Sequence, residues 1–301
     1  MLRPVALSMT FAAILGCGAP RQPGPPEAAR LLPAPPLAAG LKVTIAPNLP
    51  DVPSGDLPEE TEREVEILAL SAERLRLRWS GRVRRETPES AGRRASWLRA
   101  RTSAGSHEPP PSPVPPLFEE SEVTGTLEFP DFGSSRALLL PGLWPEGHVL
   151  LRGSSGMWLS SGALAEIAGT RRVVVPFLNA RALRDPAAAL LERASEIAHE
   201  REPGSADEWR LLPGAGRSTL EVDGVRGDVA TLRLSSWFGT FEVLSDPKNP
   251  IVLSVYPSPS SSGLMPLFAP ARVMRMLLAY RVVALDGRLA KKPAPGGEGA
   301  P

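Results

Sequence analysis

Apolar and charged residues alternate with a period of two in several segments of this chain, and this pattern constrains its fold most. It is clearest in residues 64–67 (Glu-Val-Glu-Ile) and 74–79 (Arg-Leu-Arg-Leu-Arg-Trp). Successive side chains of a strand point to opposite faces, so each segment has one apolar and one charged face. The alternation predicts a mainly β protein with few helices (α+β), built on an antiparallel sheet in a sandwich or a half-barrel.

These two segments form a predicted hairpin, and both of its faces indicate the same register. A turn around Ser71 places Val65 opposite Leu77 on the apolar face. The same register brings Glu66 opposite Arg76 on the charged face. Agreement between apolar pairing and opposite-charge pairing is typical of a hairpin with one buried face.

A second hairpin is predicted between residues 219–223 and 230–234, which also alternate. A three-residue loop, Val225-Arg226-Gly227, places Leu220 opposite Leu232. Gly227 then supplies the positive φ of a G1 bulge.

The remaining predicted elements follow from shorter patterns. Strands are expected at residues 172–177, 240–244 and 251–256, the last two joined by a proline turn at 246–250. Helices are expected at residues 161–168 and 186–201, the second because Asp185-Pro186 is a typical helix start. Residues 273–285 are apolar without a decisive period, so strand and helix both stay open.

The N-terminus has the three parts of a secretory signal. Residues 1–4 carry a positive charge, residues 5–15 form an apolar run, and a small residue precedes Cys17. The run is shorter than the ~20 residues of a membrane-spanning helix. Residues 14–17, Ile-Leu-Gly-Cys, resemble the lipobox of bacterial lipoproteins, although Leu15 stands where a small residue is usual. This resemblance implies that Cys17 is diacylated and becomes the N-terminus of the mature protein.

The lipobox resemblance sets the predicted domain organisation. Residues 1–16 are the signal peptide, and 17–40 are the lipidated cysteine with a proline-rich tether. Residues 41–287 form the β-rich domain, interrupted by a proline-rich loop or linker at 108–116, and 288–301 form a disordered tail. The tether cannot form regular helix or central strand because of its prolines.

The resemblance also implies a place in the cell. A lipid-anchored protein lies at the cell envelope, and Gly18 after the cysteine favours the outer membrane, facing the periplasm or the cell surface. Cys17 is the only cysteine of the 301 residues, so an intramolecular disulfide is impossible. Acylation of its thiol leaves no cysteine for catalysis or for a metal site.

Charge and histidine content exclude several other functions. Lys and Arg number 34 and Asp and Glu 33, which gives no general attraction to nucleic acid, and no nucleic-acid partner is expected. Three histidines are spread along the chain without zinc-ligand spacing. His199-Glu200 resembles the start of a zinc-protease helix, but Pro203 stands where the second histidine belongs. We therefore expect no metal and no cofactor.

A serine nucleophile is suggested by one motif only. Residues 153–157, Gly-Ser-Ser-Gly-Met, approach the elbow of a serine hydrolase around Ser155, and His148 or His199 is the available base. Met157 replaces the last glycine, and we interpret the segment as an ordinary loop.

Arginine and tryptophan are the other notable residues. Residues 74–101 contain ten arginines and two acidic residues. They form either a basic face for anionic lipid, lipopolysaccharide or a polyanionic glycan, or a solvated strand face neutralised across the hairpin by Glu64 and Glu66. We favour the solvated face. The six tryptophans are interpreted as core, Trp79 and Trp158 most clearly.

No catalytic, cofactor-binding or metal-binding set emerges from the sequence. We therefore expect a membrane-anchored cell-envelope lipoprotein with a non-catalytic binding or scaffolding role, attached through its lipid, with an envelope protein, lipid or glycan as partner. The alternative is a carrier of lipids or lipoproteins, in which helix 186–201 covers an apolar cavity lined by Leu232, Leu234, Val243 and Leu253. A serine hydrolase is a third, weaker alternative.

Overall fold

The computed structural model describes residues 31–47, 60–103, 115, 117–176, 207–236, 239–257 and 279–290. The strands of this part are β1 (Lys42–Pro47), β2 (Glu60–Leu70), β3 (Leu75–Glu86), β4 (Phe118–Phe129), β5 (Gly147–Leu150), β6 (Arg172–Val174), β7 (Glu208–Leu211), β8 (Gly216–Val222), β9 (Val225–Ser235), β10 (Gly239–Leu244), β11 (Val252–Pro257) and β12 (Tyr280–Asp286). The helices of the same part are α1 (Pro88–Ser103), α2 (Ser161–Thr170) and a 3-10 turn at Pro141–Leu143. The predicted fold class, mainly β with few helices, is confirmed.

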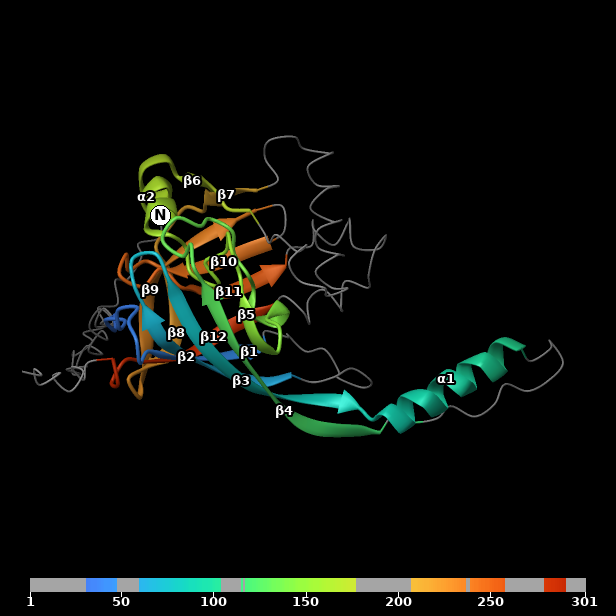
Figure 1. Cartoon of the computed structure of the whole chain (residues 1–301). Coiled ribbons are helices and arrows are strands. Elements are labelled where there is room, and N and C mark those ends of the chain that lie inside the picture. Colours follow the sequence, from blue (N-terminus) through green and yellow to red (C-terminus); the bar gives the residue numbers. More distant parts are fainter. Residues whose placement is uncertain are drawn as a thin grey trace, which may run out of the picture. The chain divides into compact units, whose positions relative to one another are not determined.

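Twelve strands of the described residues form one sheet that closes on itself at one side (Figure 1). The order runs β5-β4-β3-β2-β1-β12-β11-β10-β9-β7-β6, and β8 pairs with both β12 and β9. Strands β8 to β12 therefore make a closed five-stranded barrel. Barrel strands that follow one another in the chain pair in antiparallel orientation. The closing pair, β8 with β12, is parallel, as an odd number of up-and-down strands requires.

Strand β12 joins the barrel to the open part of the sheet. One of its edges pairs with β1 along its whole length. The other edge pairs first with β11, at Tyr280 and Arg281, and then with β8, at Ala284 and Leu285. The Tyr280 hydroxyl donates a hydrogen bond of 3.0 Å to the Val252 carbonyl, and burial raises the pKa of this phenol. Both parts of the sheet consequently share one strand and one hydrophobic core.

Buried aromatic side chains fill this core. Trp79, Trp158 and Trp209 are at most 2% exposed, so the prediction that Trp79 and Trp158 are core is confirmed. The Trp158 indole donates to the side-chain oxygen of Asn249 at 3.0 Å. Trp209 of β7 stacks on Phe241 of β10 with ring centroids 3.9 Å apart. Such rings supply a large share of the buried apolar area.

The β2–β3 hairpin exists, but its predicted register is wrong by two residues. Val65 lies opposite Trp79, not opposite Leu77. A bulge between Ile67 and Ala69 shifts the strands, and the chain turns through residues 71–74. A slip of two residues keeps every side chain on its face, so the hydrophobic pattern alone cannot detect it.

The β8–β9 hairpin also has a register different from the predicted one. Its turn is Asp223-Gly224, both with positive φ (52° and 85°), so the proposed loop and G1 bulge at residues 225–227 are wrong. Leu220 consequently lies opposite Gly227 and not opposite Leu232. Asp-Gly is the usual sequence of a two-residue hairpin turn that needs positive φ at both positions.

Of the two α-helices in the described residues, one was predicted from the sequence. Helix α2 confirms the predicted helix at 161–168; Ser160 caps it by accepting a hydrogen bond of 3.2 Å from the Ala163 amide. Helix α1 was not predicted. The helix expected at 186–201 lies outside the described residues, as do Phe177 and residues 273–278 of the apolar segment 273–285. Residues 280–285 of that segment belong to β12, so strand is the correct alternative there.

Residues 31–40, expected to belong to the tether, instead pack on the barrel. The Leu32 amide donates to the Asp228 carbonyl at 2.7 Å, and the Asn249 side chain donates to the Pro35 carbonyl at 2.9 Å. Leu32 and Leu37 pack against the core. The proline-rich run here is therefore a fixed surface segment. The signal peptide, Cys17, the tail beyond residue 290 and all of the 108–116 loop except Pro115 lie outside the described residues.

Candidate functional site

The outer face of β2, β3 and β4 carries rows of charged side chains, which we call the charged sheet face. It consists of Glu62, Glu64 and Glu66 on β2, Arg74, Arg76, Arg78 and Arg82 next to or on β3, and Glu122 and Glu128 on β4. Period-two alternation places them opposite the core-facing residues of the same strands. The arginine row thus lies between two glutamate rows.

Ion pairs cross this face in both directions from β3. Arg78 lies 2.6 Å from Glu66 of β2, and Arg74 lies 3.3 Å from Glu128 of β4. These contacts support the interpretation of residues 74–86 as a solvated strand face. Of the two glutamates expected to neutralise this face, Glu66 does so, whereas Glu64 forms no ion pair within the described part of the chain. Glu128 of β4, which alternation in β2 and β3 does not indicate, supplies the other ion pair.

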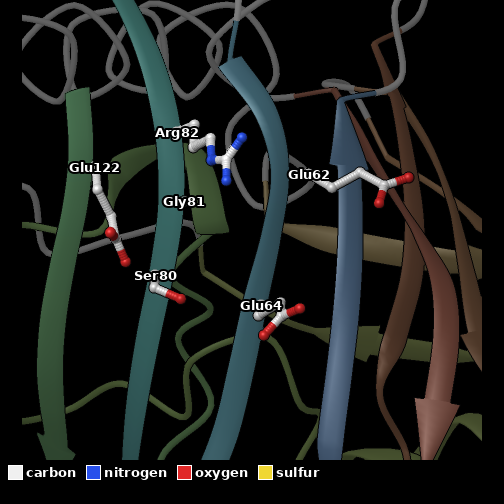
Figure 2. Close-up of a pocket in the computed structure, with 6 residues that line it drawn as sticks. All are labelled: Glu62, Glu64, Ser80, Gly81, Arg82 and Glu122. Carbon is white, nitrogen blue, oxygen red and sulfur yellow. The ribbon is translucent and has the colours of Figure 1, made fainter. Parts of the chain in front are cut away.

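A hollow of about 580 Å³ opens on the charged sheet face (Figure 2). Its lining residues come from three adjacent strands and are Glu62, Glu64, Ser80, Gly81, Arg82 and Glu122. A second hollow of about 420 Å³ also contains Glu62 and is lined by residues of β1, β8, β9 and β12, among them Thr219, Glu221, Arg226 and Arg281. Both hollows are open and lined mainly by polar groups.

The carboxylates of the first hollow are available to a ligand. Glu62, Glu64 and Glu122 are exposed and form no hydrogen bond or ion pair within the described part of the chain. The described residues contain no group of three or more His, Cys, Asp or Glu side chains suited to a metal ion. The backbone beneath these side chains is held by paired strands, so the hollow can present fixed charges to a polar partner surface.

Helix α1 is the second candidate surface. It follows β3 directly and leads back to β4 (Figure 1). Ser90 is the only buried residue between Pro88 and Thr102: its hydroxyl donates to Glu86 at 2.8 Å and accepts from the Leu117 amide at 2.8 Å. This anchors the first turn of the helix to the ends of β3 and β4. The interpretation of residues 74–101 as strand is therefore wrong from Pro88 onward.

The arginines of α1 are mostly unneutralised. Arg94 lies 2.6 Å from Glu86. Arg93, Arg99 and Arg101 have no carboxylate partner among the described residues. The Arg101 guanidinium lies 5.3 Å from the centre of the Trp97 ring, within the range of a cation–π contact.

Ser155 is a structural residue in this fold. It is fully buried, and its hydroxyl donates a hydrogen bond of 2.6 Å to the Trp158 carbonyl. The positive φ of Gly156 (65°) turns the chain directly after it. His148 is exposed on the edge strand β5, and His199 lies outside the described residues. A hydroxyl held by a backbone carbonyl is not poised for attack, so the geometry gives the hydrolase hypothesis no support.

The side chains proposed to line a carrier cavity belong to the packed core. Leu234, Val243 and Leu253 are at most 2% exposed, and Leu232 packs against the same cluster. The wall of a ligand-sized cavity retains surface accessible to a water-sized probe, and these three residues retain almost none. The described part of the barrel therefore offers no acyl chain a site at these positions.

No helix of the described residues has both the length and the apolar character needed to cross a membrane. No known protein-family model matches the chain, and no significant similarity connects it to a curated protein or to a solved structure.

Proposed function

We propose that this protein is a membrane-anchored cell-envelope lipoprotein whose β domain binds a partner without catalysing a reaction. The anchor is Cys17, on the ground of the lipobox-like sequence that ends at this residue. The observation that carries the binding role is the charged sheet face with its open hollow around Glu62. The core beneath the face is filled, so the domain presents its chemistry outward.

This face suits a macromolecular partner better than a small metabolite. Pockets for small molecules are usually enclosed and mostly apolar, with a few polar groups that set orientation. The hollows on this protein are open and polar, and charges of both signs surround them. Complementary charge of this kind increases the specificity and the association rate of a protein partner more than its raw affinity. An envelope protein with a charged surface is the partner we propose.

Replacing the anchor residue tests the proposed location. Cys17→Ser is expected to move the protein from the membrane fraction to the soluble fraction, or to leave its signal peptide uncleaved, because the hydroxyl cannot form the thioether. Immunoblots of fractionated cells give both readouts. Ser8→Ala, which keeps the apolar run and the lipobox-like residues, is the matched control. Unchanged membrane retention of Cys17→Ser after a high-salt wash, with a processed N-terminus, would contradict the lipoprotein assignment.

A further inference from the structure

Helix α1 has the composition of a surface that meets negative charge. Its sixteen residues contain four arginines and one glutamate, and residues 88–102 are all exposed or half-exposed except Ser90. Helices in proteins gain most of their stability by packing an apolar face. No face of α1 is buried against the described strands, so folding of the domain does not explain the helix.

The charges of α1 complement a phosphate-bearing surface. Arg94 pairs with Glu86, whereas Arg93, Arg99 and Arg101 have no carboxylate partner among the described residues. Guanidinium groups bind phosphate oxygens through two parallel hydrogen bonds and keep their charge at every physiological pH. The helix therefore offers three free groups of the kind that anionic lipid headgroups attract.

The apolar residues of α1 favour a bilayer over a soluble polyanion. Leu98 is 50% exposed, and its spacing places it on one face with Ala91 and Ala95. Trp97, beside Arg101, combines an apolar ring with a polar nitrogen, the property that concentrates tryptophan at membrane interfaces. A soluble polyanion needs the arginines only, whereas a bilayer interface uses both kinds of side chain.

From these observations we infer that α1 binds the headgroup region of an anionic lipid bilayer and gives the anchored protein a second membrane contact. The inference rests on the proposed membrane location. It explains why an arginine-rich helix without a packed face is inserted between β3 and β4, away from the charged sheet face, which stays available to a partner.

Vesicle flotation of the unacylated protein tests this inference. The full chain with Cys17→Ser is mixed with vesicles of phosphatidylcholine alone or of phosphatidylcholine with phosphatidylglycerol. We expect binding that depends on phosphatidylglycerol and weakens at least about tenfold when Arg93, Arg99 and Arg101 are all changed to Glu. The control carries Arg152→Glu, Arg171→Glu and Arg217→Glu, an equal charge change at exposed residues outside α1 and the charged sheet face, and should bind as the parent does.

Several outcomes would overturn the inference. Equal binding by the α1 triple variant and the control would do so, as would equal binding to both vesicle types. Binding to soluble heparin but not to vesicles would assign α1 to a polyanionic polymer instead. A cooperative thermal unfolding transition of each variant serves as the control that it is folded. A blue shift of tryptophan fluorescence on vesicles, reduced by Trp97→Phe, is expected in addition, and its persistence in that variant would place the contact elsewhere.

The anchor and the helix are tested separately by these experiments. Vesicle binding by α1 is measured without an acyl chain, so it can fail while Cys17 remains the anchor. Membrane retention of Cys17→Ser with a processed N-terminus, lost when the α1 triple change is added, would support the helix and leave the anchor to be decided by the mass of the wild-type N-terminal peptide.

Discussion

Trp209→Ala is expected to lower the free energy of unfolding by about 3–5 kcal/mol. Trp209 has no exposed surface, and its ring stacks on Phe241 at 3.9 Å with an angle of 17° between the planes. This contact joins β7 to β10, so its loss opens a cavity beside the barrel that its rigid strands cannot fill. Urea denaturation followed by circular dichroism measures the change.

Trp97→Ala on helix α1 is the matched control, because it removes the same side chain from a half-exposed position. Its effect on the free energy of unfolding should be below about 1 kcal/mol. Equal destabilisation by the two variants would mean that the barrel core is not packed as the structure has it.

Gly125→Ala is the second substitution for which we expect a large effect. A Cβ atom at this position of β4 would overlap the Trp79 indole nitrogen and lie 2.7 Å from Cε2 of the same ring and 2.8 Å from the Pro145 carbonyl oxygen. The Trp79 ring is buried and the Pro145 oxygen belongs to the backbone, so neither can move aside without a large energetic cost. Overpacking of this kind costs about 1–3 kcal/mol or more, and a lower thermal unfolding temperature is the readout.

Two further variants make the Gly125 result specific. Gly162→Ala in helix α2, where a Cβ atom meets nothing within 4 Å, should leave the unfolding temperature unchanged or raise it slightly. Trp79→Phe removes the indole atoms nearest to the new methyl group, so in combination with Gly125→Ala it should cost less than the two single changes added together. Strict additivity would show that the ring is not the obstacle.

Local pattern predicts seven of the twelve described strands, leaves β12 open between strand and helix, and does not identify β1, β4, β5 and β7. It predicts the pairing less well. Alternation marks the faces of β2 and β3 correctly, but a two-residue slip leaves those faces unchanged, and the bulge after Ile67 has no sequence signal. For β8 and β9 a signal existed: Asp223-Gly224 is a common two-residue turn and indicates the observed register directly. The parallel pairing of β8 with β12 joins distant segments and has no local signal at all.

Helix α1 shows the limit of hydrophobic periodicity. Beyond its anchored first turn the helix buries no side chain against the described strands, and Ala91, Ala95 and Leu98 alone form too small an apolar face to predict a helix. Its start was nevertheless visible: the Thr87 hydroxyl accepts from the Ser90 amide at 3.2 Å, and Pro88 and Glu89 occupy the first turn. This is the same type of start that predicted a helix after Asp185.

Predicting the hollow around Glu62 requires knowledge of which strands pair across long stretches of the chain. Alternation places Glu64 and the β3 arginines on one face, but Glu122 joins them only through the pairing of β3 with β4, in which Arg82 lies opposite Glu122. Residues 87–117, which include the whole of α1, separate those strands in the chain. A site built across such a connection cannot be assembled from alternation within single strands.

Mass spectrometry of the mature N-terminus tests the central claim most directly. The protein is purified from the membrane fraction and digested with trypsin, which releases residues 17–21, Cys-Gly-Ala-Pro-Arg. We expect this peptide to begin at Cys17 and to carry the mass of a diacylglyceryl thioether, with residues 1–16 absent. A mature chain that begins elsewhere, or one with an unmodified Cys17, would contradict the account of this protein as an envelope lipoprotein.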